Sequence, residues 1–233
     1  MGKSTDYHDY VFRDGKLIGE FEDMYKNSSN VPWHQDEQAN WIDVRFTREL
    51  LRESAAYSEI HDIGCGTGHY LNLIGNDFLL ENGFLYGYDV SPSACKIAQA
   101  NFPSSFFSCY DVTVNNNPAI SNQQSAISNQ QSAISNQQSR LIMIRGTLWY
   151  VFPKLTTVIE NLASSMTPID ELLVVQNFPP LNEDFIGKDV LPNHHSLINK
   201  FSSRFLCVKH LWYESKLHNT NDNWFVGIFV LST

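Results

Sequence analysis

The chain has 233 residues, of which 42% are hydrophobic, and its formal net charge is −9. This length suits one domain with a sizeable buried core. An acidic surface repels phosphate backbones and the Lys and Arg residues are scattered, so we expect no nucleic-acid partner. No run approaches the ~18 apolar residues that cross a bilayer, and the polar N-terminus lacks the apolar core of a signal peptide. We therefore expect a cytoplasmic protein without a membrane partner.

The cysteines give no sign of a metal centre or of disulfides. Cys65, Cys95, Cys109 and Cys207 form no CxxC pair. This spacing favours neither a zinc knuckle nor a disulfide framework. We expect reduced, mostly buried thiols and no bound metal.

Two regions differ in their patterning. Residues 1–55 are polar and aromatic, and we expect a helical lid or cap that ends in a helix over 41–53. In 56–233 strands and helices alternate with short connections, which predicts an α/β domain with a doubly wound parallel sheet covered on both faces. The last two strands should form a hairpin. The expected strands are 58–64, 85–90, 106–111, 141–146, 171–178, 205–215 and 223–232, and the expected helices are 69–75, 91–101, a helix opened by Pro153, and 194–201.

Residues 119–139 are three identical copies of AISNQQS. Each copy supplies only one Ala and one Ile among polar residues, which is too little burial to offset the entropy of ordering. The seven-residue period also admits a frayed polar helix. We expect a flexible insertion between the third and fourth strands.

The segment DIGCGTG (62–68) follows the first expected strand. Glycines let the backbone turn sharply and approach a ligand closely. The next helix directs its N-terminal N–H groups and its dipole to the same place. In an open parallel sheet, ligands bind beyond the carboxyl ends of the strands. Such loops also serve dinucleotides and plain tight turns, so the glycines alone leave the ligand open.

Two acids end the neighbouring strands. Asp89 ends the second strand, about 20 residues past the glycines, where a carboxylate can accept both hydroxyls of a ribose. Asp111 ends the third strand, where a polar side chain can meet an adenine edge. The structural alternative is that Asp89 caps the helix starting at Ser91-Pro92 and that Asp111 begins a loop.

DIGCGTG, GYDVSPSA (87–94) and YDV (110–112) together resemble the pattern of class I S-adenosylmethionine-dependent methyltransferases, from about Glu59 to the C-terminus. The resemblance implies a Rossmann-like sheet of seven strands in the order 3-2-1-4-5-7-6, with strand seven antiparallel, and S-adenosylmethionine as the cofactor. It also implies a set of cofactor-binding positions. These are Asp62, Gly64, Cys65, Gly66, Gly68, Tyr70, Asp89, Val90, Asp111, Val112, Arg145 and Gly146.

The resemblance further implies a role for several of these positions. Asp62 would lie near the methionyl amino group, the three glycines against the methionyl and ribose parts, Asp89 on the ribose, and Asp111 with Val112 near adenine. The chain departs from the pattern at His61, where an aliphatic residue is usual and where we interpret the histidine as a core residue. The repeat insertion is a second departure, and the absence of an acid before the fourth strand, where Ser139-Arg140 stands, is a third.

The sequence indicates the residues that bind the methyl acceptor less clearly than those that bind the cofactor. RGTLWYVFP (145–153) resembles the family's segment after the fourth strand, so Trp149 and Tyr150 should border the substrate. In similar small-molecule methyltransferases an aromatic N-terminal segment forms a lid, which assigns Tyr25 and Trp33 to the substrate as well. Packing of this segment on the surface is the alternative.

Three histidines are the candidate catalytic residues. His34 lies in the expected lid, and His194 and His195 begin a helix after the fifth strand, a region that often lines the acceptor site. The unperturbed pKa of histidine lies near neutrality, which suits removal of a proton from an oxygen acceptor. An exposed, polar helix start is the alternative for His194 and His195.

We therefore expect a methyltransferase that moves a methyl group to an O or N atom of a small organic acceptor in a biosynthetic pathway, as a monomer or homodimer. A non-catalytic cofactor-binding or interaction protein remains an alternative, and so does an NAD-linked oxidoreductase. Dinucleotide folds favour GxGxxG, whereas the spacing here is GxGxG, which favours the methyltransferase.

Overall fold

The computed structural model describes residues 4–114, 139–215 and 223–232. The AISNQQS repeats fall outside the described residues except for Ser139. No helix in the described part of the chain is both long and apolar enough to span a bilayer.

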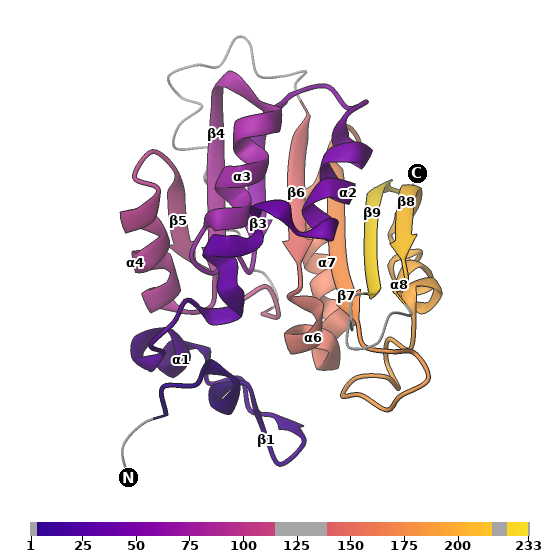
Figure 1. Ribbon diagram of the computed structural model, residues 1–233. Coiled ribbons are helices and arrows are strands. Elements are labelled where there is room, and N and C mark those ends of the chain that lie inside the picture. Colours follow the sequence, from indigo (N-terminus) through magenta and orange to yellow (C-terminus); the bar gives the residue numbers. More distant parts are fainter. Residues whose placement is uncertain (1–3, 115–138, 216–222, 233) are drawn as a thin grey trace.

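A seven-stranded sheet has the order β5-β4-β3-β6-β7-β9-β8 (Figure 1). β9 is antiparallel to β7 and β8, and the remaining pairings are parallel. Numbered within the sheet, this is the predicted order 3-2-1-4-5-7-6 with an antiparallel seventh strand, so the expected fold class is confirmed. The strands are β3 (Tyr57–Ile63), β4 (Leu79–Asp89), β5 (Phe106–Cys109), β6 (Arg140–Arg145), β7 (Glu171–Phe178), β8 (Phe205–Tyr213) and β9 (Asn223–Leu231).

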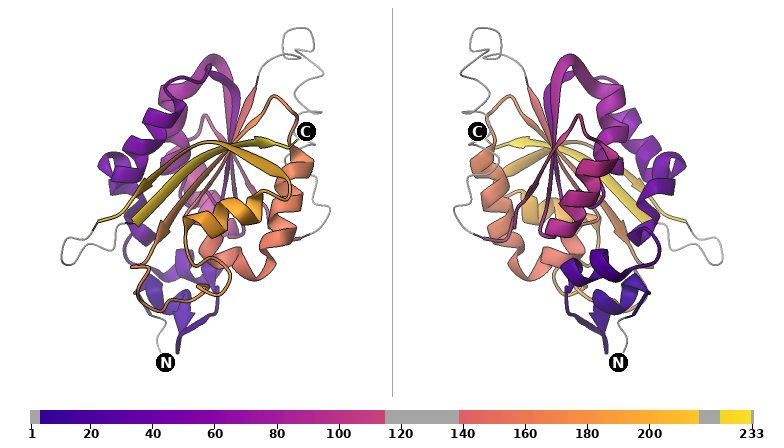
Figure 2. Two further views of the ribbon diagram at one scale, coloured as in Figure 1. Left: turned by 90° about the vertical axis from the view of Figure 1, so that its right-hand side faces the viewer. Right: turned by 90° about the vertical axis from the view of Figure 1, so that its left-hand side faces the viewer.

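Helices cover both faces of the sheet, α2 and α3 on one side and α7 and α8 on the other (Figure 2). The strand β6 shows why its sequence is continuously apolar. Leu141 and Met143 pack towards α2 and α3, while Ile142 and Ile144 pack towards α7 and α8. A strand buried on both faces needs apolar residues at every position. The helices are α2 (Ile42–Leu51), α3 (His69–Phe78), α4 (Pro92–Asn101), α6 (Leu148–Val151), α7 (Leu155–Ser165) and α8 (His194–Phe201).

Some boundaries differ from the expected ones. β4 begins at Leu79, earlier than 85, where its pairing with β3 is irregular. β5 stops at Cys109 because Asp111 accepts hydrogen bonds from the amide and hydroxyl of Thr113, which forms a turn. Pro153 lies in a short 3-10 helix, η4 (Phe152–Lys154), and α7 begins only after it.

The segment before the sheet lies beyond the carboxyl ends of the parallel strands (Figure 1). It contains helices as expected, and also a small hairpin that turns at Asp14-Gly15, both with positive φ. Asp-Gly is a favoured sequence for such tight turns. We call this segment, residues 4–40, the cap. Its elements are η1 (Tyr7–Tyr10), β1 (Phe12–Arg13), β2 (Lys16–Leu17), α1 (Phe21–Asn27) and η2 (Pro32–Asn40).

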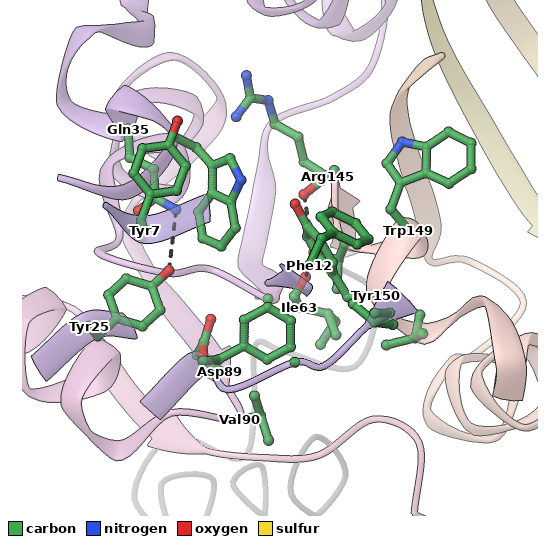
Figure 3. Close-up of a pocket in the computed structure, with 18 of the residues that line it drawn as sticks. Tyr7, Phe12, Tyr25, Gln35, Ile63, Asp89, Val90, Arg145, Trp149 and Tyr150 are labelled. Carbon is green, nitrogen blue, oxygen red and sulfur yellow. Dashed lines mark hydrogen bonds between the residues drawn. The ribbon is translucent and has the colours of Figure 1, made fainter. Parts of the chain in front are cut away.

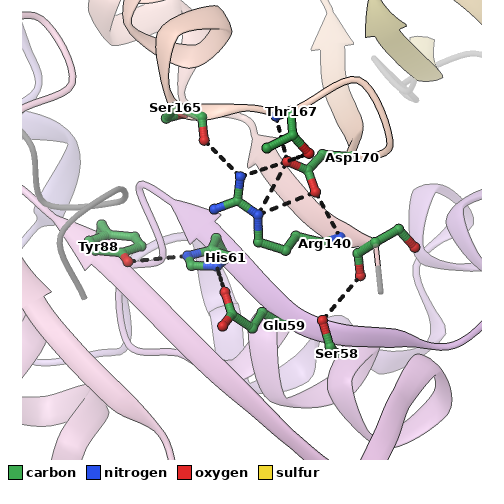
Figure 4. Close-up of polar contacts among 9 residues, drawn as sticks. Ser58, Glu59, His61, Tyr88, Arg140, Ser165, Thr167 and Asp170 are labelled. Atoms are coloured by element: carbon green, nitrogen blue, oxygen red, sulfur yellow. Dashed lines mark hydrogen bonds and ion pairs between the residues drawn. The ribbon is translucent and has the colours of Figure 1, made fainter. Parts of the chain in front are cut away.

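A buried polar network supports the sheet near the start of β6 (Figure 4). Arg140 donates to Asp170 at 2.6 Å, and the side chains of the pair are 6% and 1% exposed. Burial raises the pKa of Asp170, but hydrogen bonds from Arg140 and Thr167 outweigh it and leave the pKa lowered. The acid that the family pattern places before this strand is absent. Arg140 stands there instead and is paired with Asp170.

His61 lies beside this network and is a core residue, 1% exposed (Figure 4). Its ring nitrogens pair with the Tyr88 hydroxyl at 3.2 Å and the Glu59 carboxylate at 3.0 Å. The ring stacks on Tyr86, and burial lowers its pKa. Both nitrogens of the neutral His61 ring therefore have partners within the sheet, which suits a structural role for this residue.

We predict that Asp170→Ala lowers the free energy of unfolding by about 3–5 kcal/mol, because it leaves the Arg140 guanidinium buried without its partner. Urea denaturation measures this. Asp184→Ala, at a fully exposed carboxylate, is the matched control and should change stability by less than about 0.5 kcal/mol. Equal effects of the two substitutions would contradict the assignment.

Candidate functional site

The glycine loop joins β3 to α3 in a conformation that requires glycine. Gly64, Gly66 and Gly68 have φ values of 78°, 54° and 84°. A Cβ on Gly64 would lie 2.2 Å from Thr147 Oγ1. The Gly64 and Cys65 amides both donate to the carbonyl of Tyr88, which holds the loop against the end of β4.

Asp89 ends β4 and fixes the loop from the other side. Its carboxylate accepts the Gly66 amide at 3.0 Å and the Ser91 amide at 2.9 Å. Burial raises its pKa to about 6, although these two hydrogen bonds act in the opposite direction. The helix cap itself is Ser91, whose Oγ accepts the Ala94 amide. Asp89 therefore holds the loop and also presents a carboxylate to the cavity described below.

Asp62 and Arg145 are two buried charges near the ends of β3 and β6. Burial raises the pKa of Asp62 to about 7, while the positive charge of Arg145 lowers it. Arg145 Nε donates to Asp43 at 2.6 Å, and Nη1 donates to Gln38. The guanidinium lies over the Tyr70 ring, 4.6 Å from its centroid. Arg145 Nη2 and Asp43 Oδ1 are buried without a hydrogen-bond partner among the described residues.

A cavity of about 1220 Å³ lies between the cap and the carboxyl ends of the strands (Figure 3). Pockets for single small ligands are commonly about 300–1,000 Å³, so this one has room for a donor and a small acceptor together. Twelve of the positions singled out by the sequence line it. They are Gly64, Asp89, Val90, Asp111, Val112, Arg145 and Gly146, together with Tyr25, Trp33, His34, Trp149 and Tyr150.

Other predicted positions do not line the cavity. Five of them lie behind the cavity wall, where they form the glycine loop or pack beneath that loop. They are Asp62, Cys65, Gly66, Gly68 and Tyr70. The Tyr70 hydroxyl pairs with Thr47 at 2.8 Å, and burial raises the pKa of the Cys65 thiol.

The candidate histidines are not brought together. His34 is on the cavity wall, but half of its side chain is exposed, and it lies 3.7 Å from Glu37. His194 and His195 do not line the cavity. His194 stacks on Trp212 with ring centroids 4.2 Å apart, and burial lowers its pKa to about 4. The structure therefore gives these two histidines no contact with the cavity.

Two cap residues that the sequence did not reveal contact the core of the site. Gln35 Oε1 accepts the Thr67 amide at 2.8 Å and its hydroxyl at 2.6 Å, at the start of α3. Glu22 accepts hydrogen bonds from Ser91 Oγ and from the amide and hydroxyl of Ser93, at the start of α4. The free amides at a helix N-terminus need hydrogen-bond acceptors. The sequence around α3 and α4 does not show that Gln35 and Glu22, far away in the chain, supply these acceptors.

No protein-family model and no curated protein matches the sequence. Solved structures match the fold. The N-methyltransferase NodS from Bradyrhizobium japonicum WM9 is 14% identical with a TM-score of 0.55, over 82% of this chain and 94% of NodS. A SAM-dependent methyltransferase from Aquifex aeolicus is 12% identical with a TM-score of 0.56, over 84% and 92%.

A third structure, described for the conversion of a disulfide bond into a thioacetal group during echinomycin biosynthesis, is 13% identical with a TM-score of 0.59. It covers 91% of each chain. The chain thus has the fold of class I S-adenosylmethionine-dependent methyltransferases.

Two glycines with similar φ allow the loop geometry to be tested. Gly146→Ala should cost about 1 kcal/mol, because a Cβ there meets no atom within 4 Å and only the left-handed backbone is strained. Gly64→Ala should cost about 1–3 kcal/mol more, because its Cβ collides with Thr147. Urea unfolding of both variants measures the difference, and equal losses would show that the loop does not depend on this close approach.

Proposed function

We propose that the protein is an S-adenosylmethionine-dependent methyltransferase that acts on a small organic acceptor. The observation that supports this best is the convergence of the glycine loop, Asp89 and Arg145 at one cavity, at the carboxyl edge of a sheet with the methyltransferase strand order. Fold alone does not define a function, so the chemistry of these side chains carries the proposal.

The residues present fit the cofactor. Arg145 Nη2 is a buried donor without a partner among the described residues, and Asp62 is a buried carboxyl group with a pKa of about 7. An α-amino acid group in the cavity suits both, because its carboxylate can accept from Arg145 and the charge of its ammonium, acting across the cavity wall, favours the ionised form of Asp62. Asp89 would hold the ribose hydroxyls, with Val90 and Val112 beside adenine. Bound S-adenosylmethionine supplies a methyl group activated by a positively charged sulfur.

The remaining task of the protein is to orient the acceptor and to exclude water. We propose that the cap, residues 4–40, acts as a lid over the cavity, whereas α2 packs on the sheet and belongs to the domain beneath. Tyr25, Trp33, Trp149 and Tyr150 would border the acceptor. The size of the cavity favours a small molecule of the kind that biosynthetic pathways modify.

The proposal predicts that S-adenosylhomocysteine binds and that NAD does not. Its affinity should fall about tenfold between about pH 7.5 and about pH 6, because Asp62 and Asp89 take up protons across this interval and the protonated acids are poorer partners. Isothermal titration calorimetry measures both ligands.

Asp62→Asn is the matched variant for this test. It should bind S-adenosylhomocysteine more weakly at about pH 7.5. It should also lose most of the pH dependence, because Asp62, with a pKa of about 7, is the acid that takes up most of its proton within this interval. Binding of NAD in place of S-adenosylhomocysteine by the folded wild type would contradict the proposal and favour an oxidoreductase.

A further inference from the structure

The outer part of the cavity has an aromatic wall built from the cap and the core. Tyr150 on α6 contacts three cap rings, with centroid distances of 5.2 Å to Phe21, 5.6 Å to Trp33 and 6.4 Å to Phe12. Figure 3 shows Phe12, Tyr150 and Trp149 on the same side of the cavity, opposite Tyr25 and Gln35. This wall lies where the cap packs against α6.

Part of this aromatic surface stays open. Phe12 is 36% exposed and Trp41 is 37% exposed, and both line the cavity. Covering such surface with an apolar ligand removes it from water and is therefore favourable. A flat, ring-bearing acceptor therefore gains more from this wall than a flexible polar one.

The charges that line the cavity are mainly negative. Five carboxylates and one guanidinium are among the described lining residues. The guanidinium, Arg145, lies 2.6 Å from Asp43, and under the proposed function its remaining donor serves the cofactor. The lining carboxylates are Glu20, Glu22, Asp23, Asp89 and Asp111.

Two cations beside the lining are paired with its carboxylates, because Arg13 lies 3.2 Å from Glu20 and Lys26 lies 2.9 Å from Glu22. Lys16, which precedes the lining residue Leu17, is exposed on β2. Within the described lining itself, an acceptor with a carboxylate or phosphate group would lose water and meet only Arg145, which is committed to Asp43. Burial of an unpaired anion is costly, so the cavity selects against such acceptors.

We propose that the acceptor is an arylalkylamine, an aromatic ring joined to an aliphatic amine, which rests on the proposed methyltransferase function, and that the cavity rejects ring-matched anions. The ring lies on the aromatic wall, and the amino or ammonium group faces ring faces and carboxylates. A cation over an aromatic ring is attracted by the negative face of the ring.

An amine also suits the chemistry available. The bound ammonium first gives a proton to water. The lone pair of the neutral nitrogen then forms the new N–CH₃ bond, the S–CH₃ bond breaks with its electron pair left on sulfur, and the product is the methylated ammonium. Water is a sufficient proton acceptor for an ammonium group, whereas the far less acidic hydroxyl of an alcohol calls for a positioned base. Asp89 is committed to two backbone amides, and His34 is half exposed beside Glu37, so neither is placed as a buried base.

Three probes with one ring and similar length test the proposal, namely phenethylamine, phenethyl alcohol and hydrocinnamate. Each is titrated by calorimetry into protein saturated with S-adenosylhomocysteine. Phenethylamine should bind at least about tenfold more tightly than hydrocinnamate, a difference of about 1.4 kcal/mol, with the alcohol between them. Hydrocinnamate binding as tightly as the amine, or no binding by any of the three, would overturn the inference. A protein that cannot be saturated with S-adenosylhomocysteine contradicts the proposed function itself.

Phe12→Ser tests the aromatic wall separately. It should weaken phenethylamine about threefold to tenfold and leave the affinity for S-adenosylhomocysteine unchanged. Phe106→Ser is the control, because Phe106 is 43% exposed but lies on β5 outside the cavity lining, and it should change neither affinity. Equal effects of the two substitutions on phenethylamine would refute a role for the wall.

Discussion

The arrangement of the site depends on one buried carboxylate. Asp89 accepts the amides of Gly66 and Ser91, so the glycine loop, the end of β4 and the start of α4 meet at a single side chain. Ser91 also donates to Glu22 of the cap, which extends the connection to the N-terminal segment. Burial alone would favour the protonated acid, and the two amides offset part of that cost. The same carboxylate lines the cavity, so the group that holds the loop is also the one proposed to bind the ligand.

A second constraint is the placement of Arg145. Its guanidinium is surrounded by the rings of Tyr70, Trp41 and Trp224 and is paired with Asp43 at the start of α2. Charged groups away from water are stable only when they are paired and hydrogen-bonded. Because the Arg145 guanidinium is paired with Asp43, the only cation in the described cavity lining is already committed. The proposed preference for a non-anionic acceptor rests on this pairing.

Local sequence carried enough information for the sheet and for the glycine loop. DIGCGTG with Asp89 predicted the loop correctly, because positive φ and a close approach to Thr147 require glycine at fixed positions. Contacts between distant segments were not predictable. Nothing near Gln35 shows that it meets Thr67. His194 and His195 were placed on the right helix, but sequence position does not show that His194 stacks on Trp212.

The central claim is that Asp89 binds the ribose of an adenosyl cofactor while holding the glycine loop. A crystal structure of the complex with S-adenosylhomocysteine tests it most directly. The account predicts both ribose hydroxyls within hydrogen-bond distance of the Asp89 carboxylate, with the Gly66 amide contact retained and the sulfur directed towards the aromatic wall. An adenosyl group bound elsewhere, or a ribose that does not reach Asp89, would contradict the account.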